Sequence, residues 1–135
     1  MSNNRIPIAT VGLGLMGSSI ATCLLAAGHK VTSLVLNVEK GRQAQTKILN
    51  FLKQLKDEQL LDEDPSVIIA RMDITDDIQQ LADFEIIIES IHESVEDKRK
   101  LFQQLEATVS PTTIIGSNTS AIPVTILQEG FGKLG

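Results

Sequence analysis

The strongest constraint on the fold is a glycine-rich turn near the start of the chain, Gly12-Leu13-Gly14-Leu15-Met16-Gly17, with the spacing G-x-G-x-x-G. An apolar run at 6–11 precedes the turn and indicates a buried strand. Apolar positions at helical spacing over 15–27 follow it, and Gly28 provides the C-terminal stop. A strand, a glycine turn and a helix in this order are typical of a turn that binds a dinucleotide.

Each glycine of the turn has a separate physical reason. Gly12 allows the tight turn, Gly14 lets the backbone approach a pyrophosphate, and Gly17 lets the helix pack close to the strand. The backbone amides and the positive dipole end of the helix then attract phosphates without any lysine. We therefore expect a dinucleotide to contact the turn, at Gly12, Gly14, Leu15, Met16 and Gly17. The alternative is a glycine turn kept for packing alone.

Length and composition limit the other possibilities. The chain has 135 residues, so we expect one domain over 1–135. With 12 Lys+Arg against 17 Asp+Glu, the net charge is −5, which disfavours a nucleic-acid partner. The single cysteine, Cys23, allows no internal disulfide, and no apolar run is long enough to cross a membrane. We expect no metal site, and a cytoplasmic location because the N-terminal sequence does not resemble a secretory signal.

The rest of the chain alternates between strand-like and helix-like segments. This alternation predicts an α/β protein of the Rossmann type: a doubly wound, mainly parallel sheet with helices on both faces. Ligands of such sheets bind beyond the carboxyl ends of the strands. The further strands are expected at 31–36, 67–72, 84–88 and 113–116, the helices at 39–56, 95–109 (with Ser94 as N-cap) and 123–128, and a short acidic helix or turn at 74–81.

The end of the second expected strand bears on the choice of cofactor. An acidic residue is usual there, because it accepts hydrogen bonds from the adenosine ribose. This chain has Asn37 instead, with Lys40 and Arg42 nearby. Asparagine can still bond to a ribose hydroxyl, but it does not repel a 2′-phosphate. NAD is therefore the expected cofactor, with contact at Asn37, and NADP stays the less favoured alternative.

Polar segments follow the last two expected strands, at 89–98 and 117–120. Both lie at the edge of the sheet where the nicotinamide half of a cofactor would rest. The plainer interpretations are a capped helix start with solvated charges for the first and a simple polar turn for the second.

These segments together resemble the NAD-binding half of the 3-hydroxyacyl-CoA dehydrogenase family. The opening G-L-G-L-M-G is shared with a wider group of dehydrogenases, including those of 3-hydroxyisobutyrate and prephenate. The stretch FEIIIESIHESVEDKRKLFQQLEATVSPTTIIGSNTS matches the acyl-CoA family in order and spacing. The resemblance covers nearly the whole chain and is weakest over 37–83.

The resemblance implies roles for residues of both polar segments. Glu93 and Lys98 would contact the cofactor near the nicotinamide ribose. Ser120 would hydrogen-bond the 3-oxygen of the substrate and touch the cofactor, with Asn118 as a neighbour in that network. The helical region around Lys53 and Lys56 would help to bind an acyl-CoA substrate.

The resemblance also implies the reaction, a hydride transfer between NAD and C3 of a 3-hydroxyacyl-CoA, in fatty-acid or butanoate metabolism. The family takes the hydroxyl proton with a histidine in a segment like H-F-F-N-P, which this sequence does not reach. His29 lies at the wrong end of the expected sheet, and His92 has no catalytic counterpart in the family. We expect a truncated cofactor domain, inactive alone, from an enzyme that forms a homodimer when full length.

Two other functions stay open from the sequence. One is a non-catalytic dinucleotide-binding module, which has kept cofactor binding and lost catalytic activity. The other is a dehydrogenase of a small hydroxy acid from the wider group that shares the opening glycine motif.

Overall fold

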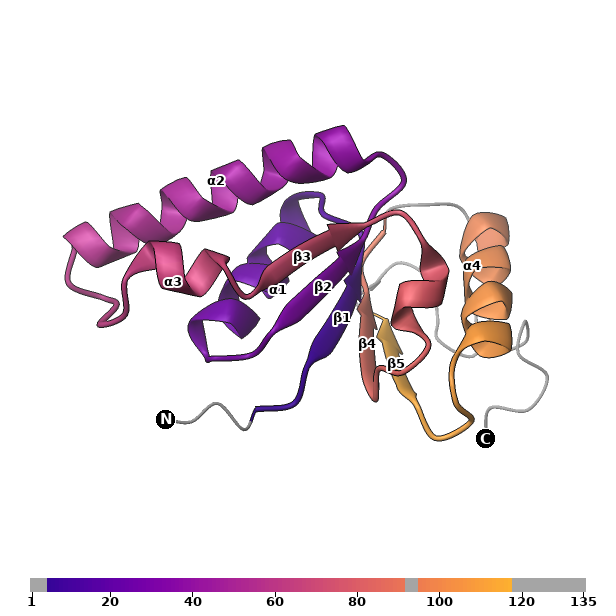
Figure 1. The fold of residues 1–135 in the computed structure, drawn as a ribbon. Helices are drawn as coiled ribbons and strands as arrows, with labels where there is room; N and C mark the ends of the chain where they lie inside the picture. Colours follow the sequence, from indigo (N-terminus) through magenta and orange to yellow (C-terminus); the bar gives the residue numbers. More distant parts are fainter. Residues whose placement is uncertain (1–4, 92–94, 118–135) are drawn as a thin grey trace.

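A parallel sheet forms the centre of the fold (Figure 1). The computed structural model describes residues 5–91 and 95–117. Its strand order is β3-β2-β1-β4-β5, and each neighbouring pair in this sheet is parallel. The predicted class, a doubly wound parallel sheet of the Rossmann type, is confirmed. The strands are β1 (Ile8–Val11), β2 (Val31–Leu34), β3 (Met72–Thr75), β4 (Ile86–Glu89) and β5 (Ile114–Ser117).

Helices connect the strands and cover both faces of the sheet. In Figure 1, α1 and α2 lie toward β2 and β3, whereas α4 stands beside β4 and β5. The helical elements are α1 (Leu15–Ala26), α2 (Val38–Asp57), the short α3 (Pro65–Ile69), the 3-10 turn η1 (Ile78–Leu81) and α4 (Val95–Thr108).

The two faces of the sheet have separate hydrophobic cores. On one face α1, α2 and α3 pack over β2 and β3, with Leu25, Leu52 and Ile68 fully buried. On the other face α4 and η1 pack over β1 and β4 through Leu105, Leu81 and Ile87. Alternate residues of a strand point to opposite faces, so β2 contributes Val31 to the first core and Leu34 to the second.

One predicted strand was wrong. The apolar run at 67–72 suggested a strand, but its first part belongs to α3, and β3 begins only at Met72. The reason is local: Pro65 occupies the first turn of α3, and the Asp64 side chain accepts a hydrogen bond from the Ser66 amide at 2.9 Å. Proline at the first helical position and aspartate at the N-cap both favour a helix start.

The other predicted elements in the described range are confirmed within a few residues. The expected short helix or turn at 74–81 is divided between the end of β3 and η1. The proposed cap Ser94 and the expected helix at 123–128 lie outside the described residues. In the part of the chain that is described, no helix is long and apolar enough to span a membrane.

The strand order places a topological switch point beside β1. The chain passes from β1 through α1 to β2 on one side, and β4 pairs with β1 on the other side. Loops that leave the carboxyl ends of β1 and β4 therefore turn in opposite directions. This reversal is the topological switch point at which ligands bind to open α/β sheets.

Candidate functional site

The glycine turn lies at this switch point and packs tightly against the loop after β4. Gly12 has a φ of +98°, and a Cβ atom there would lie 2.8 Å from Cγ2 of Ile91. A Cβ on Gly17 would lie 2.2 Å from the Gly12 carbonyl oxygen and 2.7 Å from Oγ of Ser90. Gly12 and Gly17 are thus required by the backbone conformation and by close packing, as the sequence predicts.

Gly14 has a different environment from the other glycines of the turn. Its φ is −71°, and a Cβ atom there would meet nothing within 4 Å. Within residues 5–91 and 95–117, no side chain caps the start of α1, and Leu15 and Met16 in its first turn are 88% and 47% exposed. Open space beside Gly14 at an uncapped helix N-terminus suits a pyrophosphate, which would bind to the backbone amides there.

Asn37 lies between β2 and α2, where the adenosine ribose is expected. Its Oδ1 accepts a hydrogen bond from the Lys40 amide at 3.0 Å, so the side chain is the N-cap of α2. Both Asn37 and Lys40 are exposed. The side-chain carbonyl of Asn37 is therefore used for capping, and its amide group is the part that can donate to a ribose hydroxyl.

A buried carboxylate lies at the carboxyl end of β4, in register with the end of β1. Glu89, the last residue of β4, is fully buried, and its Oε2 lies 2.6 Å from Nζ of Lys98, which is also fully buried. The same oxygen accepts from the Ile91 amide at 2.6 Å, and Oε1 accepts from the Ser117 hydroxyl at 2.8 Å. This Glu89 network joins β4, the loop after β4, the first turns of α4 and the end of β5.

Lys98 was expected to contact the cofactor near the nicotinamide ribose. The structure has it buried in the first turn of α4, with its ammonium group paired to Glu89. The contact with the cofactor stays a prediction, and Lys98 lies at the carboxyl end of the sheet, as that prediction requires.

Three of the expected site residues, Glu93, Asn118 and Ser120, lie outside the described residues, as does His92. Ser117 is the last described residue before Asn118, and it lies beside β4 in register with Glu89. Ser117 therefore ends β5 at the same end of the sheet as the glycine turn.

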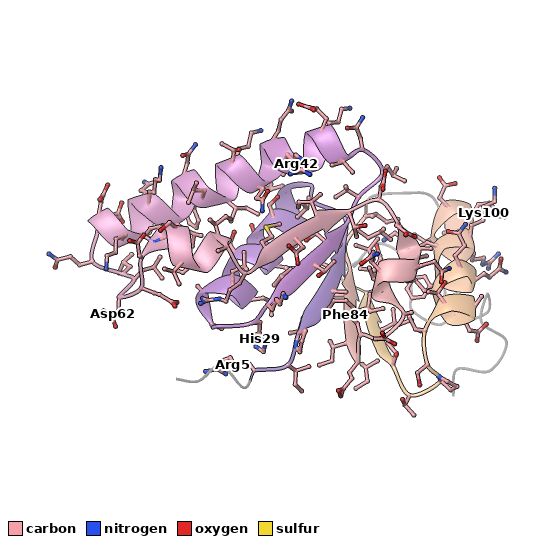
Figure 2. The ribbon with its side chains drawn as sticks, viewed as in Figure 1. Arg5, His29, Arg42, Asp62, Phe84 and Lys100 are labelled. Atoms are coloured by element: carbon pink, nitrogen blue, oxygen red, sulfur yellow. The ribbon has the colours of Figure 1, made fainter. Side chains whose placement is uncertain are left out.

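The remaining candidates lie away from the switch point. His29 precedes β2, and its Nδ1 lies 2.8 Å from the carbonyl oxygen of Ile6, so it is at the amino end of the sheet as predicted (Figure 2). Lys53 and Lys56 are exposed in the second half of α2, and Nζ of Lys56 donates to the carbonyl oxygen of Asp62 at 2.6 Å.

Metal chemistry has no support in the described part of the chain, which contains no group of metal-ligating side chains. The groups with shifted pKa values also lie away from the switch point. The hydrogen bond from Arg71 lowers the pKa of Glu63, and the backbone amide of Ser66 lowers the pKa of Asp64, near the start of α3.

Comparison with known proteins agrees with this geometry. The family model described as "3-hydroxyacyl-CoA dehydrogenase, NAD binding domain" matches residues 7–134. A probable 3-hydroxybutyryl-CoA dehydrogenase of Deinococcus radiodurans is 32% identical over 91% of this chain and 44% of its own length. A peroxisomal fatty acid beta-oxidation multifunctional protein of Arabidopsis thaliana is 30% identical over 90% of this chain and 17% of its own length.

The fold is also similar to that of a solved relative. The crystal structure of 3-hydroxybutyryl-CoA dehydrogenase from Escherichia coli aligns with a TM-score of 0.86 and 30% identity, over 92% of this chain and 26% of that chain. The chain thus spans less than half the length of each of these relatives.

A parallel sheet with an open glycine turn at its switch point defines a dinucleotide-binding domain of the Rossmann class. Within that class, the chain belongs to the family of NAD-binding domains of 3-hydroxyacyl-CoA dehydrogenases. The predicted family and the predicted cofactor, NAD, are confirmed.

Sequence reasoning missed Glu89 as a site residue. The signal was present, because a glutamate ends the otherwise apolar run of β4. A charged residue in a buried strand needs a partner of opposite charge, and Lys98 on the following helix is that partner. The contacts of Ser90 and Ile91 with the glycine turn had no comparable signal, since they depend on how two loops meet.

Proposed function

We propose that this chain is the cofactor domain of an enzyme that transfers a hydride between NAD and C3 of a 3-hydroxyacyl-CoA. The observation that carries the proposal is the open space beside Gly14 at the uncapped start of α1, at the switch point between β1 and β4. Gly12 and Gly17 are needed for packing, but no contact within the described residues requires a glycine at Gly14. A bound pyrophosphate explains it, because only glycine leaves room for phosphate oxygens to reach the backbone.

The proposed reaction converts a 3-hydroxyacyl thioester into a 3-ketoacyl thioester. NAD, when bound, supplies the acceptor for the hydride that leaves C3. Ser120 would donate a hydrogen bond to the 3-oxygen of the substrate, with Asn118 beside it. Glu93 and Lys98 would hold the nicotinamide ribose, and Asn37 the adenosine ribose.

A general base must take the hydroxyl proton as the hydride leaves. His29 cannot serve, because it bonds to Ile6 at the amino end of the sheet. The proposal assigns this proton to a histidine, as the resemblance to the family implies. We expect these 135 residues alone to bind cofactor and to show little or no turnover.

The proposed substrate is an acyl-CoA, and exposed Lys53 on α2 is the candidate to contact its phosphates. We further propose a homodimer for the full-length enzyme and a location in the cytoplasm. The peroxisomal name of the Arabidopsis relative makes a membrane-bounded compartment the alternative location.

The test of the function is a comparison of substrates with the full-length enzyme. NADH oxidation with acetoacetyl-CoA, and its loss on changing Ser120→Ala, supports the proposal. Activity with free acetoacetate but not with the thioester assigns the enzyme to small hydroxy acids instead. Saturable NADH binding without turnover of either substrate points to a non-catalytic binding module.

A further inference from the structure

We propose that Glu89 is a positioning residue for the nicotinamide half of the cofactor site. It acts through Lys98, the loop after β4 and the end of β5, and it does not itself touch the cofactor. This inference rests on the proposed function, in that it requires a dinucleotide to bind at the switch point between β1 and β4.

Burial is the first step of the argument. Glu89 and Lys98 are both fully buried, and a buried carboxylate or ammonium group is costly unless it is paired and hydrogen-bonded. An apolar pair of similar size would fill the same space at no such cost. A charged pair at this point therefore indicates a requirement other than packing.

The contacts of Glu89 show what that requirement is. Oε2 accepts from the Ile91 amide at 2.6 Å, which fixes the first turn of the loop after β4. Ile91 in turn lies over Gly12, where a Cβ atom would meet its Cγ2 at 2.8 Å. The backbone of Gly12 is held separately, by the hydrogen bond from its amide to the Leu34 carbonyl oxygen at 3.0 Å, so the carboxylate positions the loop after β4 and not the glycine turn.

The other oxygen of the carboxylate reaches the neighbouring strand. Oε1 accepts from the Ser117 hydroxyl at 2.8 Å, and Ser117 pairs with Glu89 in the β4–β5 register. Ser117 directly precedes Asn118 in the chain. Glu89 therefore holds the last described residue before the segment that is proposed to contact the substrate oxygen.

The hydrogen bonds of the Glu89 carboxylate all come from residues on the β4 and β5 side of the switch point. The adenosine end of the site is built from the loops after β1 and β2, at Gly14 and Asn37, and the Glu89 network does not include them. Loss of the Glu89 carboxylate should therefore weaken binding of the nicotinamide half and leave binding of the adenosine diphosphate half nearly unchanged.

The experiment compares NADH with ADP, which lacks the nicotinamide riboside, by calorimetric titration of the 135-residue chain. For Glu89→Gln we expect the dissociation constant of NADH to rise about tenfold or more, and that of ADP to change less than about twofold. The matched control is Glu85→Gln, the same substitution at the exposed amino end of β4, and both constants should stay as in the wild type. A merely structural role would move both ligands together.

Two results overturn the inference: unchanged NADH binding in Glu89→Gln, or equal weakening of NADH and ADP. If Glu89→Gln does not fold, because Lys98 loses its counterion, the test uses Ser117→Ala and Glu89→Asp, which keeps the negative charge but shortens the side chain. Selective loss of NADH binding in either of these supports the inference, and its absence in both overturns it. Failure of the wild type to bind either ligand contradicts the proposed function itself.

Discussion

Gly17 packs so closely against Gly12 that a Cβ atom on Gly17 would lie 2.2 Å from the Gly12 carbonyl oxygen. The neighbour is backbone of the same turn, held in place by a φ of +98° at Gly12 and by the hydrogen bond from its amide to the Leu34 carbonyl oxygen at 3.0 Å. The turn cannot move away without disturbing the pairing of β1 with β2. Close packing of α1 on the sheet thus depends on the absence of a side chain at Gly17.

We expect Gly17→Ala to destabilise the fold. Its methyl group must displace backbone, so the free energy of unfolding should fall by about 3 kcal/mol, the upper end for overpacking. The midpoint of thermal unfolding, followed by circular dichroism, should fall by ~10 °C. A variant as stable as the wild type would contradict the close packing of α1 on this turn.

Gly14→Ala should weaken cofactor binding and leave stability nearly unchanged, in contrast to Gly17→Ala. The Cβ atom meets no neighbour within 4 Å and the φ of −71° is open to alanine, so stability should change by less than about 1 kcal/mol. The methyl group would occupy the space assigned to the pyrophosphate, and NADH affinity should fall at least about tenfold. Wild-type affinity in this variant would show that phosphate does not approach the turn at Gly14.

Asn37→Asp should change the choice between cofactors. Aspartate caps a helix as well as asparagine does, so the bond to the Lys40 amide and the stability should be kept. Its negative charge repels a 2′-phosphate, and NADPH affinity should fall about tenfold while NADH affinity is kept or improved. Parallel fluorescence titrations with the two cofactors measure this.

A control for the cap accompanies this experiment. Asn37→Ala removes the bond to Lys40 and should cost about 1 kcal/mol of stability without adding any charge. If Asn37→Asp leaves the ratio of NADPH to NADH affinity unchanged, Asn37 does not face the ribose.

The ion pair between Arg71 and Glu63 should make stability depend on pH. The bond from Arg71 holds the pKa of Glu63 below its ordinary value of 4.5. A lowered pKa stabilises the fold at pH values above the ordinary value, and this contribution is lost as the pH falls through the lowered value of the folded state. Glu63→Gln should therefore be less stable than the wild type at neutral pH and equal to it in acid.

The size of this effect is limited by exposure, because the two side chains are 21% and 44% exposed. We expect a difference of about 0.2–1 kcal/mol at neutral pH, measured by urea unfolding. Asp62→Asn removes a charge from the same exposed turn and serves as the control. A stability difference that persists unchanged in acid would rule out the ionised pair as its source.

The order of strands and helices along the chain could be predicted from the sequence because the patterns that indicate each element are local. The glycine turn, the apolar run of β1 and the helical spacing of α1 are adjacent in the chain and point to the same structure. The one misassigned element, α3, also had a local signal for a helix start in Asp64 and Pro65. A run of only five residues, most of them apolar, is however compatible with a strand or with a helix.

The site was predicted less completely, because part of it depends on contacts between distant segments. Gly12, Gly14 and Gly17 follow from spacing alone. The pairing of Glu89 with Ser117 joins residues of β4 and β5 that are separated by a whole helix. The hydrophobic periodicity of the sequence does not indicate such a contact. It can be recognised only when the strand order and register are known.

The most direct test of the central claim is a titration of the 135-residue chain with NADH, followed by the fluorescence of the cofactor, and repeated with NADPH. The chain has no Trp or Tyr, so its own emission interferes little. Saturable binding of NADH, tighter than that of NADPH, is the result that our account predicts. No binding of either cofactor, in a sample shown to be folded by circular dichroism, would contradict it.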